Sequence, residues 1–147
     1  MATPYSVIIN AFIIKVRAYQ LIALLEEERE DMAIAYLDAA VSKFYRKCKA
    51  NLLDRDLDNK TFNKELSVDE IDILAELMVV EWLTPQMYDD ELLESRLNTK
   101  DFTEYSPAKL IEQIRYVFES SKKAAKYRMI NYTYESGNIR DLDDEND

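Results

Sequence analysis

The clearest hydrophobic pattern of the chain is a single stripe within residues 25–47. Apolar residues there recur at steps of four or three, which is the spacing of one face of an α-helix. Acidic side chains crowd the start of this segment and basic ones its end, as the helix dipole favours. We therefore predict a helix over residues 25–47 whose stripe consists of Ala33, Leu37, Ala40, Phe44 and the buried thiol of Cys48.

Residues 67–83 also predict a helix, and its first two turns are amphipathic. Ser67 and Glu70 have the spacing of a capping box, in which each side chain bonds to the backbone N–H of the other residue. A polar stripe follows the box along these turns, and we expect it at the surface. The expected surface stripe consists of Asp69, Asp72 and Glu76.

The second half of this helix is apolar on nearly every side. Val79 and Val80 occupy the place where the polar stripe would continue. A helix without a polar face is buried, so other helices or a neighbouring copy of the chain must cover it. The predicted residues of this central buried helix are Ile71, Leu74, Leu77, Met78, Val79, Val80, Trp82 and Leu83.

A threonine followed by proline predicts a new helix start after the buried segment. Thr84 is a suitable N-cap, and Pro85 suits the first helical position because its missing N–H would have no partner there. We therefore predict a break at residue 84 and a separate short acidic helix through about Leu97.

Ser106 and Pro107 repeat this start signal. No breaker follows before Gly137, a typical residue at a helix stop. Residues 107–136 can thus form one helix about 45 Å long, at about 1.5 Å per residue. Such a helix is long for a domain of this size, and we expect its far end to project.

The second half of the 107–136 helix changes in character. It becomes basic and rich in tyrosine in the stretch KKAAKYRMINYTY (122–134). The spacing of Tyr127, Ile130 and Tyr134 predicts either a docking stripe, because tyrosines supply large contact area at low entropy cost, or simply core packing. The acidic tail, residues 137–147, has too little apolar content to fold alone and can become ordered on a partner.

The N-terminal residues are the most ambiguous by pattern. Residues 6–18 are rich in Val and Ile, and Ser6 after Pro4 favours a helix over a strand. The apolar run at residues 7–14 could belong to a signal peptide, but it lacks a basic lead-in and is too short to span a bilayer. We therefore predict a buried helix in a cytosolic protein without a membrane segment. Residues 49–66 break all periodicity and are expected to form a long connection.

Composition supports a helical architecture. The chain has 147 residues with one glycine and three prolines, too few for the turns of a β-sandwich or a Rossmann-like fold. Long helices with short connections tolerate this scarcity, and a chain of this length can form one hydrophobic core. The predicted class is all-α: a single small helical bundle over residues 1–136, with a long C-terminal helix and the extended acidic tail.

The residue content excludes several kinds of chemistry. No histidine is present, which removes Ser-His-Asp and Cys-His catalysis, and a single glycine removes the glycine-rich loops that bind phosphates. Nothing marks one pair among the 29 carboxylates as catalytic. A formal charge of −10 opposes groove binding to nucleic acid, which depends on Lys and Arg. We therefore predict that the protein is not an enzyme and has no catalytic residue, cofactor or metal.

One pattern is similar to a calcium-binding loop. Within residues 54–65, aspartates at positions one, three and five and a glutamate at position twelve have the ligand rhythm of an EF-hand. The sixth position, where an EF-hand needs glycine, is Asn59, and Lys60 follows it. An acidic solvated loop is therefore the preferred interpretation, and a calcium site is the alternative.

Three segments resemble head–tail connector (adaptor) proteins of tailed phages that infect low-GC Gram-positive bacteria. They are DEIDILAELMVVEWLTPQMYDDELLESRL (69–97), NTKDFTEYSPAKLIEQIR (98–115) and YRMINYTYESG (127–137). Fainter similarity extends to AYLDAAVSKFYR and to the DRD…FN-x-EL connection, so the resemblance covers residues 30–140.

The resemblance implies an all-helical structural subunit of the virion. Such subunits form a homo-oligomeric ring, usually twelvefold, that docks on the portal protein and contacts a downstream neck or tail protein. The ring extends a channel through which DNA passes without sequence-specific binding. The expected location is the virion neck, with assembly in the host cytoplasm. The C-terminal segment would engage the portal, and the candidate portal-docking residues are Tyr127, Ile130, Tyr132, Tyr134 and Arg140.

Two other interpretations remain open from the sequence. A small acidic protein without catalytic chemistry could inhibit a host enzyme by mimicking DNA, although mimicry calls for carboxylates along an outer face. Within a phage, the chain could instead be a stopper or another neck or tail-completion subunit, although such parts are commonly β-rich.

Overall fold

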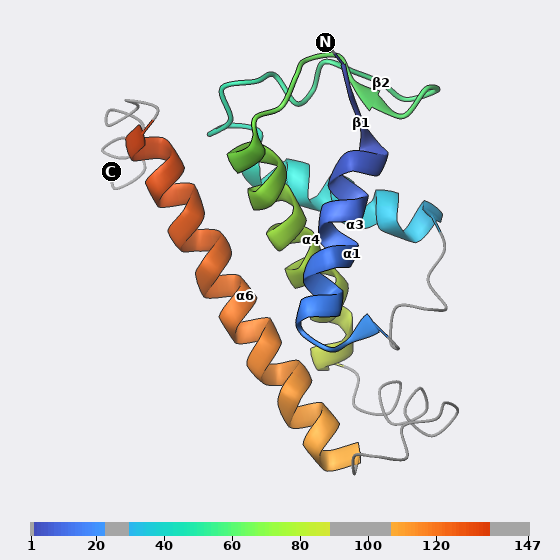
Figure 1. Cartoon of the computed structure of the whole chain (residues 1–147), viewed down its shortest axis with the longest axis vertical. Coiled ribbons are helices and arrows are strands. Elements are labelled where there is room, and N and C mark those ends of the chain that lie inside the picture. Colours follow the sequence, from blue (N-terminus) through green and yellow to red (C-terminus); the bar gives the residue numbers. More distant parts are fainter. Residues whose placement is uncertain (1, 23–29, 89–106, 136–147) are drawn as a thin grey trace.

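The computed structural model describes residues 2–22, 30–88 and 107–135, which form four helices and one small sheet (Figure 1). The chain is thus mostly helical, and the predicted small helical bundle is confirmed with a small sheet added. Among the described residues, no helix is long and apolar enough to cross a membrane. The helices are α1 (Tyr5–Ala18), α3 (Glu30–Phe44), α4 (Val68–Tyr88) and α6 (Pro107–Glu135).

The central element is α4, which packs against α1, α3 and α6. Trp82 is 1% exposed and meets the ring of Phe12 from α1 edge-on, with the ring centroids 6.0 Å apart. Other helices of the same chain therefore cover the apolar half of α4. Of the eight residues predicted for the central buried helix, Ile71 is half-buried and the buried ones are Leu74, Leu77, Met78, Val79, Val80, Trp82 and Leu83.

The predicted break at residue 84 is wrong, because α4 continues through Pro85 to Tyr88. Pro85 removes one backbone hydrogen bond, but two side chains add bonds to carbonyls of the same turn. The Thr84 hydroxyl donates to the Val80 carbonyl at 2.7 Å, and the Gln86 amide donates to the Trp82 carbonyl at 3.2 Å. Burial of this turn against the other helices outweighs the local signal for a new helix start. The remainder of the predicted acidic helix lies outside the described residues.

The predicted N-terminal helix is confirmed as α1, but it starts earlier than expected. Its N-cap is Pro4 rather than Ser6, because residues 3 and 4 already belong to a strand. The predicted helix over residues 25–47 is confirmed from Glu30 to Phe44, but it ends three residues earlier than predicted, because residues 45–47 form a turn. The predicted residues before Glu30 lie outside the described part of the chain. Cys48 lies beyond the end of α3 and is half-buried.

The connection at residues 49–66 contains two short strands that the sequence did not predict. β2 (Arg55–Asp56) and β3 (Thr61–Phe62) pair antiparallel, and β3 also pairs with β1 (Thr3–Pro4), giving the order β1-β3-β2. Asp56 closes the turn between β2 and β3 by accepting hydrogen bonds from the N–H groups of residues 58 and 59, each at 3.0 Å. The acidic pattern at residues 54–65 thus serves a hairpin turn.

The predicted long helix is confirmed as α6, which runs antiparallel to α4 along one side of the bundle (Figure 1). Its far end does not project as expected. Tyr132 and Thr133 are only 8% and 2% exposed, because the last turns of α6 pack against the start of α4 and the residues after α3. Gly137 and the acidic tail lie outside the described residues.

Candidate functional site

The helix α6 carries the candidate docking residues, and its inner face fixes how they are presented. The residues of this inner face recur at helical spacing from the second turn of α6 to its end, and they pack against α4. It consists of Ile114, Val117, Phe118, Ser121, Ala125, Tyr132 and Thr133.

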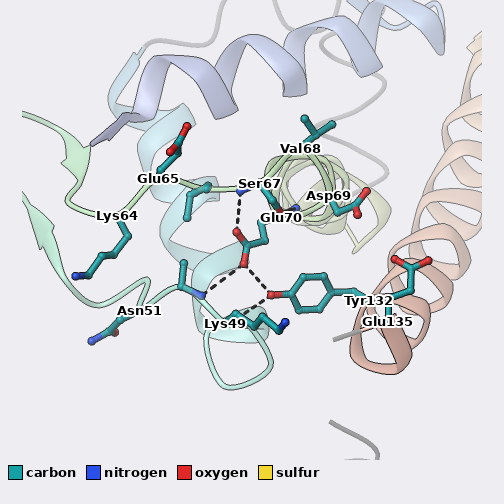
Figure 2. A pocket seen from close by; sticks show the side chains of 12 residues that line it. Lys49, Asn51, Lys64, Glu65, Ser67, Val68, Asp69, Glu70, Tyr132 and Glu135 are labelled. Atoms are coloured by element: carbon teal, nitrogen blue, oxygen red, sulfur yellow. Dashed lines mark hydrogen bonds between the residues drawn. The ribbon is translucent and has the colours of Figure 1, made fainter. Parts of the chain in front are cut away.

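The C-terminal end of α6 is held by a hydrogen-bond cluster around Glu70, which is 5% exposed (Figure 2). The Tyr132 hydroxyl donates to Oε2 of Glu70 at 2.7 Å and accepts a bond from the Lys49 N–H at 2.8 Å. The Cys48 thiol donates to the same carboxylate oxygen at 3.1 Å. The start of α4, the end of α6 and the residues after α3 therefore meet at one carboxylate.

The other oxygen of Glu70 completes the predicted capping box, which is confirmed. Oε1 accepts from the Ser67 N–H at 2.8 Å, and the Glu70 N–H donates to the Ser67 hydroxyl at 3.2 Å. Burial alone would raise the pKa of Glu70, but hydrogen bonds from Ser67, Tyr132 and Cys48 outweigh it and lower the pKa. Burial and the neighbouring carboxylate raise the pKa of Cys48 to about 12, so this thiol stays protonated and unreactive.

About one turn before Tyr132, α6 is also attached by charged groups. Arg128 of α6 pairs with Asp72 of α4, and Lys15 of α1 binds the same aspartate at 2.7 Å. Nearer the start of α6, the Gln113 amide donates to the Tyr19 carbonyl at 3.1 Å. The inner side of α6 is therefore attached at three levels along its length.

The expected surface position of Glu76 is wrong. Glu76 is 1% exposed, because α1 closes over this part of the α4 stripe. Its carboxylate accepts a bond from the Tyr19 hydroxyl at 3.1 Å and lies 4.0 Å from the Lys15 ammonium. Burial raises the pKa of Glu76, and these two partners only partly offset the effect.

The outer face of α6 gathers three of the five candidate docking residues. Tyr127, Ile130 and Tyr134 are 66%, 36% and 58% exposed. Tyr132 lies on the opposite face and belongs to the core, so its inclusion among the docking residues is corrected by its burial and its bond to Glu70. Arg140 lies outside the described residues.

The sequence-based reasoning missed Tyr116, which lies on the same outer face and is 73% exposed. It precedes Tyr127 by eleven residues, or about three helical turns. Tyr134 follows Tyr127 by seven residues, about two turns, so the three tyrosines lie on one line. This spacing is the signal that could have identified Tyr116.

The helix α6 as a whole differs in charge from the rest of the protein. The helix contains six basic and three acidic residues, a formal charge of +3 in a chain whose total is −10. At about 100° per residue, Lys109 and Lys123 lie on the tyrosine line, and the exposed Glu112 and Glu119 lie beside it. The tyrosine line thus carries charges of both signs, and its exposed aromatic rings are suited to bind another protein surface.

Two neighbouring surface hollows flank the end of α6. One of about 920 Å³ is lined by Lys49, Lys64, Glu70 and Tyr132, among others, and is shown in Figure 2. The other, of about 440 Å³, lies between α4 and α6 beside Arg128. Among the residues that the structure describes, no group of three side chains that could hold a metal ion is found.

Comparison with known proteins identifies no relative. The chain matches no protein-family model, no curated protein and no solved structure. Any function must therefore be argued from the residues and their geometry.

Proposed function

We propose that this protein is a structural subunit of a phage virion, a head–tail connector that forms a ring on the portal. In this role the ring extends the DNA channel and links the capsid to the next neck or tail component. The proposal rests on the segment resemblance, on the helical bundle, and on the absence of histidine and glycine-rich motifs in the sequence.

The observation that carries the proposal is that α6 exposes tyrosines on its outer face while its inner face is bonded to the rest of the chain. Tyr127 and Tyr134 leave most of their surface uncovered, whereas Tyr132 between them is bonded to Glu70. Exposed tyrosines on one line are typical of protein interfaces, because they bury a large area at low entropy cost. We propose that the last two turns of α6, with the residues that follow, contact the portal.

The charge of α6 argues for a connector over a DNA mimic. A mimic needs carboxylates repeated along an outer face, but α6, the longest helix in the described residues, contains six basic residues and only three acidic ones. A helix of this charge would be repelled by an enzyme surface that is built to bind phosphates.

The proposal is tested by replacing Tyr127 and Tyr134 with alanine together. We expect attachment of the purified protein to DNA-filled, tailless heads to weaken by about tenfold or more, as for interface anchors. Leu57→Ala is the matched control, because Leu57 is 69% exposed and lies on the hairpin between β2 and β3 rather than on α6. Unchanged attachment of the double variant, with helical content intact, would exclude this face as the docking site.

A further inference from the structure

The smaller of the two hollows at the end of α6 is a groove between α4 and α6, and the docking residue Tyr127 forms part of its wall. Its volume of about 440 Å³ is within the range of sites that hold small groups. Its apolar lining includes the buried side chains of Ile73 and Tyr132. The other residues that line this α4–α6 groove are Asp69, Asp72, Ala124, Arg128, Asn131 and Glu135.

The charged side chains of the groove leave an excess of negative charge. Its one basic lining residue among those described, Arg128, already pairs with Asp72, which also binds Lys15 at 2.7 Å. Asp69 and Glu135 are exposed, and neither carboxylate has a partner within the described part of the chain. Figure 2 shows both carboxylates directed toward the space between the two helices. A cation placed between them would be attracted by both.

The C-terminal end of α6 adds to this negative potential. The last carbonyl groups of a helix carry partial negative charge and favour a cation nearby. The last turn of α6 contains no basic residue and ends at Glu135. The start of α4, which is the positive end of that helix, already has a carboxylate, because Glu70 accepts the Ser67 N–H at 2.8 Å. The groove is therefore suited to a positive group from a binding partner.

We propose that the α4–α6 groove binds an arginine side chain of the protein that docks on Tyr127. The guanidinium donates hydrogen bonds to Asp69 and Glu135, while its planar face and aliphatic stem pack on the Tyr127 ring and the apolar lining. Arginine suits this site better than lysine, because its donors lie in one plane and can serve two carboxylates at once. The identity of the partner rests on the proposed function, whereas the preference for arginine rests on the groove alone.

The larger hollow beside the groove is less suited to a cation. The two hollows share Asp69, Tyr132 and Glu135, but the larger one is also lined by Lys49 and Lys64, which repel a positive group. Charge thus favours entry of the arginine from the side of Tyr127. A metal ion fits this place poorly, since no group of three metal-binding side chains occurs in the part of the chain that the structure describes.

Two short acetylated peptides test the groove in the full chain. One has an arginine between two leucines, and the other has citrulline, which is similar in shape but uncharged, in place of the arginine. Binding is followed by the backbone amide NMR signals of isotope-labelled protein. The arginine peptide should shift signals of residues 69–73 and 124–135 and bind about fivefold or more tightly than the citrulline peptide. Added salt should narrow this difference, because the groove is open to solvent.

A double variant removes the two carboxylates that lack partners. Asp69→Asn with Glu135→Gln should bind the arginine peptide only as weakly as the citrulline peptide. The matched control is Glu112→Gln with Glu119→Gln, which removes the other two acidic residues of α6, both exposed and outside the groove. This control should bind both peptides like wild type. Circular dichroism confirms that each variant is folded.

The proposal would be overturned if wild-type protein bound the two peptides equally, or bound neither at millimolar concentration. It would also be overturned if the arginine preference survived in the first double variant or disappeared in the control. These measurements contain no heads or portal protein, so their failure is distinguishable from failure of docking, which is measured with Tyr127 and Tyr134.

The head-attachment assay then tests whether the arginine belongs to the docking partner. Asp69→Asn with Glu135→Gln should attach to DNA-filled heads about fivefold more weakly than wild type, and the control variant should attach normally. Unchanged attachment of the first variant, together with its loss of peptide binding, would overturn the assignment of the arginine to that partner.

Discussion

Removing the Tyr132 hydroxyl tests how the end of α6 is held. Tyr132→Phe deletes the bond to the Glu70 carboxylate at 2.7 Å and the bond from the Lys49 N–H at 2.8 Å. A hydrogen bond to a charged group contributes about 1.5–3 kcal/mol, whereas a bond between neutral groups, such as the one from the Lys49 N–H, contributes about 0.5–1.5 kcal/mol. The ring itself remains packed on Phe44. We expect the free energy of unfolding to fall by about 2 kcal/mol.

Urea unfolding measures this loss, and the melting temperature should fall by about 4–8 °C for a chain of this size. Tyr134→Phe is the matched control, because Tyr134 is 58% exposed two residues away and should change stability by less than about 0.5 kcal/mol.

The pH dependence of the Tyr132→Phe effect checks its cause. The pKa of Glu70 is lower in the folded protein than its ordinary 4.5, so its stabilisation is present above that pH and is lost as the pH falls below it. Tyr132→Phe removes one of the hydrogen bonds that lower the pKa of Glu70. The difference in the free energy of unfolding between Tyr132→Phe and wild type should therefore shrink in acid. Equal stabilities of Tyr132→Phe and Tyr134→Phe at pH 7 would refute the assigned role of the Glu70 cluster.

Two further predictions concern the buried face of α4. Burial raises the pKa of Glu76, so the folded protein binds this proton more tightly than the unfolded chain, and stability falls as the pH rises above 4.5. Glu76→Gln should flatten this fall in urea unfolding between pH 4.5 and neutral pH, and an unchanged slope would contradict the assignment. Met78→Ala should lower the free energy of unfolding by about 2–5 kcal/mol, because Met78 is fully buried at the centre of the bundle. Val68→Ala, at an 82% exposed position, should change it by less than about 0.5 kcal/mol; similar losses for both would be inconsistent with the described core.

Local signals in the sequence were sufficient for the main helices. The capping box at Ser67 and Glu70 fixed the start of α4, and the absence of a breaker after Pro107 predicted the length of α6. The lack of a polar face after Glu76 predicted which residues of α4 are buried. Each of these features depends only on residues within one or two helical turns, and such neighbours can be read directly from the sequence.

Features that depend on distant residues were not predictable in the same way. Pro85 signals a helix start locally, but the packing of its turn against other helices keeps α4 continuous. The strand at residues 61 and 62 requires residues 3 and 4 as its partner, about sixty positions away in the chain. Glu76 is polar by type and follows the surface stripe, yet α1 covers it.

The candidate docking residues combine a feature that local spacing can predict with one that depends on distant residues. A cluster of tyrosines in the sequence suggested one site, but successive helical residues are separated by about 100°. Tyr127 and Tyr134 therefore share one face, while Tyr132 lies roughly opposite Tyr127. The periodicity alone could have separated Tyr132 from the docking residues; its bond to Glu70 required the structure.

The attachment of the inner face of α6 bears directly on what its outer face can do. Gln113, Arg128 and Tyr132 fix the helix at three levels, each to a group on another part of the chain. Side chains on such a helix lose less conformational freedom on binding than those on a free segment, so more of the contact energy remains as affinity. A projecting helix would have to become ordered when it binds. The packed helix instead presents Tyr127 and Tyr134 in a fixed register before any partner binds.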